Sequence, residues 1–308
     1  MHLEHMIISA SRRTDICAFH TEWFINRLNA GSVLVRNPVC RNVVTRVPLM
    51  RDVVDHIVFI TKDPSPMLPH LHRIDEDYSV SFQITITPYG KDIEPNVPGI
   101  GDVIESLKDV SKIIGPDRTM WRFDPILFTG SKYSQGYVLD MFDDMCQQLK
   151  GHISGCTFSF LDYYRKLDDS LGDRGVVECD DKVHFVNRLS SVAKSHGIPL
   201  SSCCEDLSGM DPYVKDVACI DPVSMRSWNV PYAIPSTPVR KGCKCVKVVD
   251  IGDYDTCSHD CMYCYANSTS IRERSMKTYY PDSELLCGWP IDGDVVSDMP
   301  VSKQARLF

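Results

Sequence analysis

The sequence predicts an α/β fold in which parallel strands alternate with helices to form a barrel or part-barrel. The first supporting observation is that 43% of the 308 residues are hydrophobic, which is ample for a sizeable core. The second is that short runs of β-branched and aromatic residues recur along the chain, with helical patterns between several of them. Such alternation indicates βα units and a mainly parallel sheet, and about six to eight units suffice for a barrel or part-barrel.

Most of the apolar runs are expected to form buried strands. They are MIISA at 6–10, SVLV at 32–35, HIVFIT at 56–61, SVSFQITIT at 79–87, TMWRF at 119–123, GCTFSF at 155–160, PLSSC at 199–203 and VKVVDI at 246–251. Amphipathic patterns predict helices at residues 101–114, 134–149 and 180–196. Gly115 and Gly197 mark the ends of the first and third helices, and Ser134 caps the start of the second.

We expect a single barrel domain over residues 1–275, followed by a polar C-terminal arm at 276–308. The sequence shows no signal peptide and no apolar stretch of about 18 residues, so it predicts a cytoplasmic protein without a membrane span. In a reducing compartment, its 14 cysteines indicate metal or redox chemistry instead of disulfides. The net charge of -8 provides no overall attraction for nucleic-acid phosphates, although a local basic cleft is compatible with it.

Polar residues directly follow several of the expected strands. They are Arg12, Arg13, Thr14 and Asp15 after the first strand, Lys62 and Asp63 after the third, Asp124 after TMWRF, Asp162 after GCTFSF, Glu205 after PLSSC, and a cysteine cluster after the last. In parallel α/β folds the carboxyl ends of the strands meet at one mouth, where ligands bind. Taken singly, each residue is better explained as a loop polar group or a helix cap. Taken together, they favour the rim of an active site.

The strongest chemical signal is CSHDCMYCYAN at residues 257–267, which spaces Cys257, Cys261 and Cys264 as C-x3-C-x2-C. Thiolates are ligands both for iron-sulfur clusters and for structural zinc. A closed cluster or a structural zinc site needs four protein ligands, whereas three cysteines leave one iron of a cubane cluster open to a small molecule. The number of protein ligands therefore distinguishes a site for chemistry from a purely structural site.

This loop, with Tyr263 just before its last cysteine, resembles the signature loop of the radical S-adenosylmethionine (SAM) enzymes, and it is similar to that of the spore photoproduct lyase group. Segments similar to those at the second, third and fourth strands of that group are TDICAFHTE at 14–22, FITKDP at 59–64 and FQITITPYGKDIEPNVP at 82–98. The resemblance implies a TIM-like barrel of the radical SAM type, circularly permuted so that the cluster-bearing strand is C-terminal. Because the first and last strands of a barrel are neighbours, the cysteines would still lie beside the TD segment.

The same resemblance implies roles for individual residues. Cys257, Cys261 and Cys264 would hold the cluster, and Tyr263 would lie against the adenine of SAM. Thr14 and Asp15 would lie near the methionine ammonium group, where a carboxylate acceptor makes a charge-assisted hydrogen bond. Alternatively, these two residues cap a helix that begins near Ala18. Cys17 is a candidate hydrogen-atom donor beside them.

From SRRTD through TKDP, WRFDPI and GCKC to KQARLF, the chain also resembles the domain of unknown function 1848 family. The pattern of that family places cysteines at four further positions, which we name the second thiol group: Cys203, Cys219, Cys243 and Cys245. Four thiols suggest a second iron-sulfur cluster or a zinc site. Alternatively, Cys204 replaces Cys203, or two of the four are simply buried small residues.

The expected function is therefore a radical SAM enzyme, in which a [4Fe-4S] cluster cleaves SAM and the 5'-deoxyadenosyl radical abstracts hydrogen from a substrate. The resemblance to the lyase group implies a pyrimidine base or nucleotide, as in DNA modification or repair, and an electron donor such as flavodoxin or ferredoxin. Lys62 and Arg122, with Arg12 and Arg13, would receive phosphate, and Asp124 lies at the same mouth. The alternatives are a peptide or small-metabolite substrate, or a noncatalytic zinc-stapled binding module.

Overall fold

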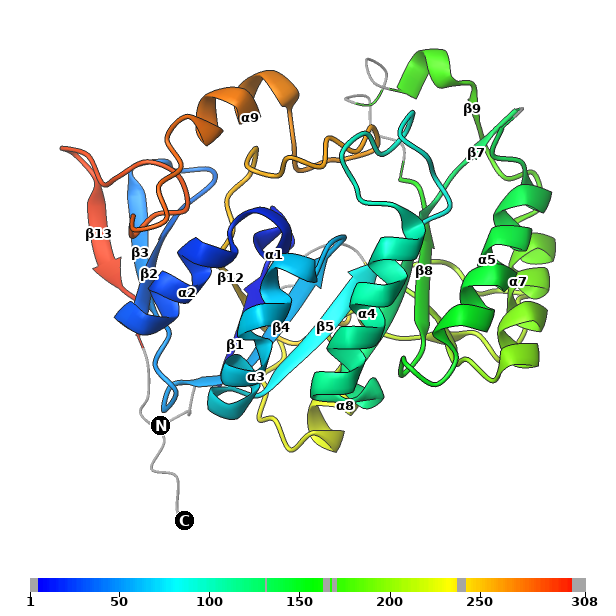
Figure 1. Ribbon diagram of the computed structural model, residues 1–308, viewed down its shortest axis with the longest axis horizontal. Coiled ribbons are helices and arrows are strands. Elements are labelled where there is room, and N and C mark those ends of the chain that lie inside the picture. The colour runs from blue at the N-terminus through cyan, green and yellow to red at the C-terminus, as the bar shows by residue number, and fades with distance from the viewer. Residues whose placement is uncertain (1–4, 131, 163–166, 168–170, 237–241, 301–308) are drawn as a thin grey trace.

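The computed structural model describes residues 5–130, 132–162, 167, 171–236 and 242–300. The strands of its main sheet are β1 (Met6–Ala10), β4 (Val54–Thr61), β5 (Val80–Thr85), β6 (Thr119–Ile126), β8 (Cys156–Phe160), β10 (Leu200–Ser202), β11 (Lys215–Asp216) and β12 (Val249–Asp250). Across the described residues these eight strands are all parallel, in the order β11-β10-β8-β6-β5-β4-β1-β12. Figure 1 labels β8, β5, β4, β1 and β12 of this series. The predicted parallel α/β class is confirmed.

The main sheet has two edges in the part of the chain that is described, because β11 and β12 are not paired with each other. The structure therefore shows a large parallel sheet flanked by helices, and it does not show a closed barrel. β12 pairs with β1, with Ile8 opposite Val249 and Ser9 opposite Asp250. The strand that precedes the cysteine loop (residues 257–264) thus lies beside the first strand of the chain. The radical SAM type of the fold and its circular permutation stay predictions.

The described helices lie between the strands along the chain, and the last of them follows β12, the last strand of the main sheet. They are α1 (Ile16–Phe19), α2 (Thr21–Ala30), α3 (Leu68–Asp77), α4 (Ile100–Ile114), α5 (Gln135–Leu149), α7 (Lys182–His196), α8 (Pro222–Ser227) and α9 (Thr269–Met276). Short 3-10 turns lie at Ser65–Met67, Pro116–Arg118 and Gly172–Arg174. The three helices predicted from periodicity are confirmed as α4, α5 and α7. The predicted cap is also confirmed, because the Ser134 side chain accepts a hydrogen bond from Tyr137 N at the start of α5.

The two faces of the main sheet pack against different parts of the chain, because successive side chains of a strand point to opposite faces. Ile8 and Phe59 lie in the largest core, together with the apolar faces of α3 and α4, which cover this face in Figure 1. Ile7 and Val58 point the other way and lie in a cluster with residues of segment 218–246. The described residues of segment 218–246 (218–236 and 242–246) therefore cover the second face beside β1 and β4.

A smaller sheet stands apart from the main one. It consists of β2 (Ser32–Arg36), β3 (Val43–Pro48) and β13 (Val295–Asp298), with β2 and β3 antiparallel and β13 parallel to β3. The run at 32–35 is therefore a strand, as predicted, but it lies outside the main parallel sheet. The physical reason is that β2 is followed after a short connection by β3, and such a connection permits only antiparallel pairing. β7 (Phe128–Thr129) and β9 (Val176–Val177) form a further antiparallel pair.

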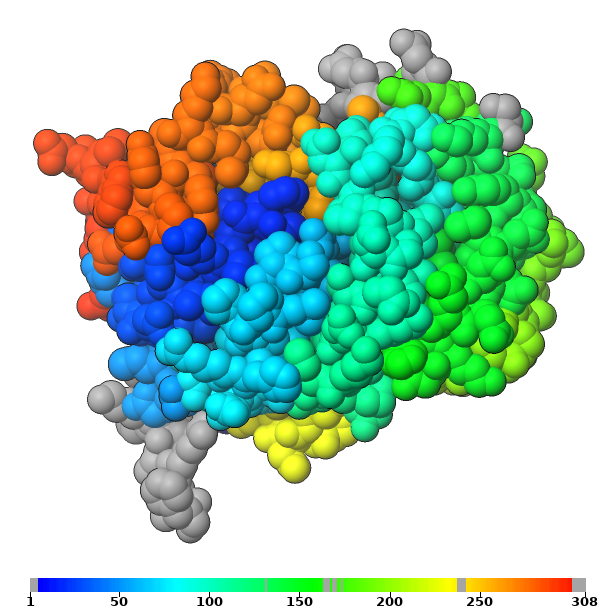
Figure 2. Space-filling model, in the orientation of Figure 1, coloured from blue at the N-terminus to red at the C-terminus, as the bar shows by residue number. Residues whose placement is uncertain are grey.

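The C-terminal arm packs against the N-terminal part of the chain. Trp23 Nε1, on α2, donates to the carbonyl oxygens of Ser283 at 2.9 Å and Leu285 at 3.1 Å. In Figure 2 the arm (orange to red) accordingly lies directly against the dark blue N-terminal residues on one side of the molecule. Residues 301–308, which include the KQARLF motif, lie outside the described residues. Among the helices that are described, none has the length and apolar character that crossing a bilayer requires.

Candidate functional site

Asp250 ties β1 and β12 together at their carboxyl ends. Its carboxylate accepts hydrogen bonds from Ser11 Oγ at 2.6 Å and from Arg12 N at 2.8 Å. Gly252 N also donates to Asp250, at 3.0 Å, so the chain that leads to the cysteine loop passes close to Ser11. The segment after β1 and the loop after β12 therefore share one mouth, as expected from the sequence.

Gly252 is needed for this close approach. A Cβ at position 252 would lie 2.7 Å from Ser11 Cβ and 3.1 Å from Thr14 Cγ2. We expect Gly252→Ala to lower the free energy of unfolding by about 2 kcal/mol, because overpacking forces the backbone to move. Urea denaturation of both variants measures this. The control is Gly101→Ala in α4, where an added Cβ meets nothing within 4 Å and the stability should be unchanged or slightly higher. Equal losses in the two variants would contradict the expectation.

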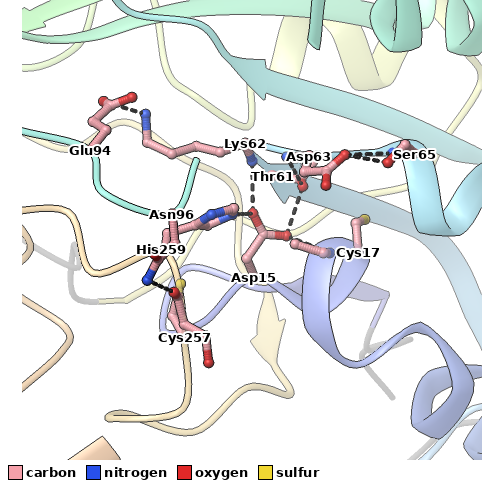
Figure 3. Close-up of polar contacts among 12 residues, drawn as sticks. Asp15, Cys17, Thr61, Lys62, Asp63, Ser65, Glu94, Asn96, Cys257 and His259 are labelled. Carbon is pink, nitrogen blue, oxygen red and sulfur yellow. Dashed lines mark hydrogen bonds and ion pairs between the residues drawn. The ribbon is translucent and has the colours of Figure 1, made fainter. Parts of the chain in front are cut away.

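Asp15 is a buried carboxylate that accepts four hydrogen bonds. It caps α1 by accepting from Ala18 N at 3.0 Å, and it accepts from Thr61 Oγ1 and from Lys62 N, both at 2.7 Å. His259 Nε2, on the cysteine loop, donates the fourth at 2.9 Å (Figure 3). Burial acts to raise the pKa of Asp15, but these hydrogen bonds, led by that of His259, hold it below its ordinary value. Asp15 therefore joins the ends of β1 and β4 to the cysteine loop.

The other residues of the TD segment differ in their surroundings. The helix cap considered as an alternative role for Asp15 is present, and its contact with a ligand ammonium stays a prediction. Thr14 Oγ1 and Arg12 Nη2 are buried without a hydrogen-bond partner among the described residues. Because such a buried group costs about 1–3 kcal/mol, both atoms are consistent with a bound polar partner. Cys17 is fully buried on α1, where burial raises its pKa, and its role as hydrogen-atom donor stays a prediction.

The cysteine loop is fixed against residues 93–96 by backbone hydrogen bonds. Asn96 N donates to His259 O at 3.2 Å, so His259 is held through both its side chain and its backbone. Within the loop, Cys264 N donates to Cys261 O at 3.0 Å, which closes a turn between the last two cysteines. The loop therefore has a defined conformation although it contains no helix or strand.

The three thiols of the cysteine loop are only partly exposed. Burial raises the pKa of Cys257 well above its ordinary value and that of Cys261 to about 12. Both thiols are therefore protonated near neutral pH when no cation is bound, and binding a metal would release these protons. Among the described side chains, no group of three or more His, Cys, Asp or Glu residues is placed to hold a metal ion. The loop therefore supplies thiols, which are the ligands of an iron-sulfur cluster, but the described side chains are not already arranged around a metal position.

Glu94 brings together two of the expected site residues, Lys62 and Tyr263. Its Oε1 accepts from Lys62 Nζ at 2.9 Å and from Thr87 Oγ1 at 2.5 Å, and it also accepts from the Tyr263 hydroxyl. The Lys62 ammonium in turn lies 5.6 Å from the centroid of the Tyr263 ring. Burial acts to raise the pKa of Glu94, but Lys62 and the two hydroxyl donors hold it below its ordinary value. Glu94 and Lys62 therefore form a charged pair, and Glu94 also holds the hydroxyl of Tyr263, which lies in the cysteine loop.

Glu94→Gln is expected to lower the free energy of unfolding by about 3 kcal/mol or more, because removing one partner leaves the other charge buried and uncompensated. The side chains of Glu94 and Lys62 are only 4% and 13% exposed, respectively. Chemical denaturation at neutral pH measures the loss. The matched control is Glu105→Gln, which breaks a surface pair with Lys108 in α4 and should cost far less. If both variants lose the same amount, the buried pair is not a major source of stability.

Arg122 and Asp124 of β6 form a second ion pair, which is half-buried. Ser159 Oγ donates to Asp124 Oδ1 at 2.5 Å, and Arg122 Nη1 lies 3.4 Å from Gln83 Oε1. Burial acts to lower the pKa of Arg122, but Asp124 raises it above its ordinary value. Because Arg122 and Lys62 already have carboxylate partners, less of their charge is available to a phosphate than the sequence alone indicates.

The second thiol group is largely brought together. The Sγ atoms of Cys203 and Cys219 lie 2.9 Å apart. A hydrogen bond with Cys203 lowers the pKa of Cys219, but a second one with Cys245 and burial outweigh it, so the pKa rises to about 11. Cys243 packs against the same hydrophobic cluster as Cys219. Three of these thiols are therefore in contact, and the fourth lies beside them.

Sequence reasoning did not assign His259, Thr61 or Glu94 to the site. For His259 the available signal was its position between the first two cysteines of the loop. For Glu94 it was the Glu-Pro pair in the segment that resembles the fourth strand of the lyase group. Neither signal shows which partner the side chain meets.

Comparison with known proteins places the chain in a family. A family described as Domain of unknown function (DUF1848) matches residues 7–266, from β1 to just after Cys264. The match includes β1–β12 and both sets of cysteines, and it leaves out α9 and the C-terminal arm. No curated protein matches the chain. The protein therefore belongs to the DUF1848 family.

Proposed function

We propose that this protein is a radical SAM enzyme. The observation that carries the proposal is the place of the cysteine loop, which follows edge strand β12 and is tied through His259 to Asp15, beside the carboxyl ends of β1 and β4. In parallel α/β folds this edge is where ligands bind. Three thiols in one short loop are also the donor set that leaves one iron of a [4Fe-4S] cluster open to SAM.

Cys257, Cys261 and Cys264 would hold the cluster, which when bound supplies the electron that cleaves SAM to a 5'-deoxyadenosyl radical. The other residues of the chain position the reactants. The Asp15–His259 hydrogen bond orients the cysteine loop, and Glu94 fixes Tyr263 by accepting its hydroxyl. Thr14 Oγ1 is the buried polar atom that we expect to contact the cofactor, since it has no partner within the described chain. A flavodoxin or ferredoxin would provide the electron.

A pyrimidine base or nucleotide is the substrate class that we propose, as in DNA modification or repair. Arg12 supports this choice, because its Nη2 is buried without a partner in the described part of the chain. Lys62 and Arg122 are paired with carboxylates, so Arg12 is the cation that we expect to contact a phosphate. A peptide or a small metabolite is the alternative substrate.

The test is anaerobic reconstitution of the full chain with ferrous iron and sulfide, followed by a reductant and SAM. The protein should turn brown and should release 5'-deoxyadenosine, and adding a pyrimidine oligonucleotide should increase the rate. A chain that is fully loaded with iron and forms no 5'-deoxyadenosine would contradict the enzymatic proposal. A colourless protein that binds only zinc would favour the noncatalytic zinc-stapled module.

A further inference from the structure

The second thiol group gathers sulfur atoms from three separate segments of the chain. Cys203 directly follows β10, Cys219 lies between β11 and α8, and Cys245 precedes β12. The Sγ atoms of Cys203 and Cys219 are 2.9 Å apart, and Cys219 also hydrogen-bonds to Cys245. Cys219 is therefore in contact with one thiol on each side, which a single disulfide would not explain.

These thiols lie in a buried part of the molecule. Cys203 and Cys245 are 7% and 5% exposed. Cys245 belongs to the cluster formed by Ile7, Val58 and residues of segment 218–246, and Cys219 and Cys243 pack against it. The guanidinium of Arg122 is close enough to Cys203 and Cys219 for both thiols to contribute to raising its pKa. A metal bound to these thiols would thus be shielded from solvent and would have a cation beside its negatively charged ligands.

The segment that carries these thiols has little regular structure to hold it. Between β10 and β12, the described residues contain only the two-residue strand β11 and the six-residue helix α8. Backbone hydrogen bonds of helices and sheets therefore stabilise this region less than they stabilise the rest of the fold. In small or irregular regions of this kind, a metal commonly supplies the missing cross-links.

Ordinary packing explains the other buried cysteines better than it explains this group. Cys146 in α5 and Cys156 in β8 belong to the main hydrophobic core and lie on regular elements. The second thiol group instead places polar sulfur atoms against one another and next to Arg122. As placed, Cys203 and Cys219 are closer than the roughly 3.8 Å that separates two thiolates on a tetrahedral zinc ion. Binding a metal would therefore require their side chains to move apart.

We propose that Cys203, Cys219, Cys243 and Cys245 form a second thiolate metal centre, distinct from the cysteine loop and beside Arg122. The four thiolates would bind a thiophilic metal, either an iron-sulfur cluster or a single zinc ion, since four thiolate ligands suit both. This centre connects segment 218–246 to the main sheet through β10 and β12. It does not depend on the radical chemistry proposed for the cysteine loop.

The test removes the cysteine loop as a competing ligand set. The full-length Cys257→Ala/Cys261→Ala/Cys264→Ala variant is purified anaerobically and divided between two arms, one reconstituted with ferrous iron and sulfide and the other titrated with Zn²⁺ or Co²⁺. We expect one metal centre per chain, seen as bound iron and sulfide in the first arm or as thiolate-to-Co²⁺ charge-transfer absorption in the second. The arm with tighter loading identifies the metal.

Substitutions in this triple variant then test the ligands. Adding Cys219→Ser or Cys245→Ser should weaken metal binding by more than about 100-fold, since changes outside the ligand shell already cost about 10–100-fold. Cys40→Ala, which removes an exposed thiol, should leave binding unchanged. Far-ultraviolet circular dichroism checks that each apo variant is folded.

Two results would overturn the proposal. One is a folded triple variant that binds neither iron with sulfide nor Zn²⁺ or Co²⁺. The other is loss of the metal in Cys204→Ala but not in Cys203→Ala, since Cys204 has its Sγ 3.9 Å from that of Cys203 and lies outside the proposed ligand set.

Discussion

Cys261→Ala is expected to abolish 5'-deoxyadenosine formation in the reconstituted protein. The cysteine loop offers three thiols, and a cluster held by only two of them would be lost or inactive. Formation should fall by at least about 1,000-fold, which corresponds to about 4 kcal/mol of lost transition-state stabilisation. The measurement is the yield of 5'-deoxyadenosine per chain after anaerobic reduction with SAM, together with bound iron and sulfide. Cys257→Ala and Cys264→Ala should behave in the same way.

The control for this experiment is another partly exposed thiol outside both sets of cysteines, Cys287 in the C-terminal arm. Cys287→Ala removes a thiol whose pKa is similarly raised by burial, to about 12, and should keep full activity. Bound iron is measured together with 5'-deoxyadenosine, because iron held by the second thiol group would remain in a variant that forms no 5'-deoxyadenosine. If Cys261→Ala forms 5'-deoxyadenosine at the normal rate, the proposed ligand set is wrong.

The elements that the sequence predicted correctly are those whose signal is local. The helix at 101–114 was identifiable because Val103, Leu107 and Val110 recur on one face and all three are buried in α4. Parallel strands were identifiable because their apolar runs are continuous and helices separate them. The pairing of β12 with β1 was expected because the first and last strands of a barrel are neighbours. The sheet itself is open between β11 and β12 in the described part of the chain.

The features that could not be predicted depend on partners far away in the sequence. β13 pairs with β3 across most of the length of the chain, and no local pattern indicates such pairing. The same is true of the Asp15–His259 hydrogen bond, whose members are 244 residues apart. Phosphate binding by Lys62 was inferred from its charge and its place after a strand, and Glu94, 32 residues later, supplies a competing partner. Residue type indicated which chemical group stands at each position. Only the fold shows which of these groups are already paired with another residue.

Asp15→Ala is expected to lower the free energy of unfolding by about 3–5 kcal/mol. Loss of the α1 cap accounts for about 1 kcal/mol of this. The remainder comes from Lys62 N and the side chains of Thr61 and His259, because a buried group left without its partner costs about 1–3 kcal/mol. Urea denaturation of the apo protein measures the total. Asp181→Ala is the matched control, since Asp181 caps α7 by accepting from His184 N at an exposed position. Its free energy of unfolding should fall only by the contribution of a helix cap, about 1 kcal/mol. Equal losses would show that Asp15 acts only as a helix cap.

The stabilisation by Asp15 should also depend on pH in a defined direction. Burial raises the pKa of Asp15, the hydrogen bond from His259 and the other donors lower it, and the net result is a folded-state pKa below the ordinary value of 3.8. A carboxylate whose pKa is lower in the folded state stabilises the fold above the unfolded-state pKa, and this stabilisation is lost as the pH falls through the folded-state pKa. Asp15→Asn cannot ionise, and its amide presents a donor where the carboxylate accepts. The stability difference between the wild type and Asp15→Asn should therefore shrink as the pH falls below about 4. A difference that grows on acidification would mean that Asp15 is protonated in the folded protein, and the hydrogen bonds that join it to the cysteine loop would then need a different assignment.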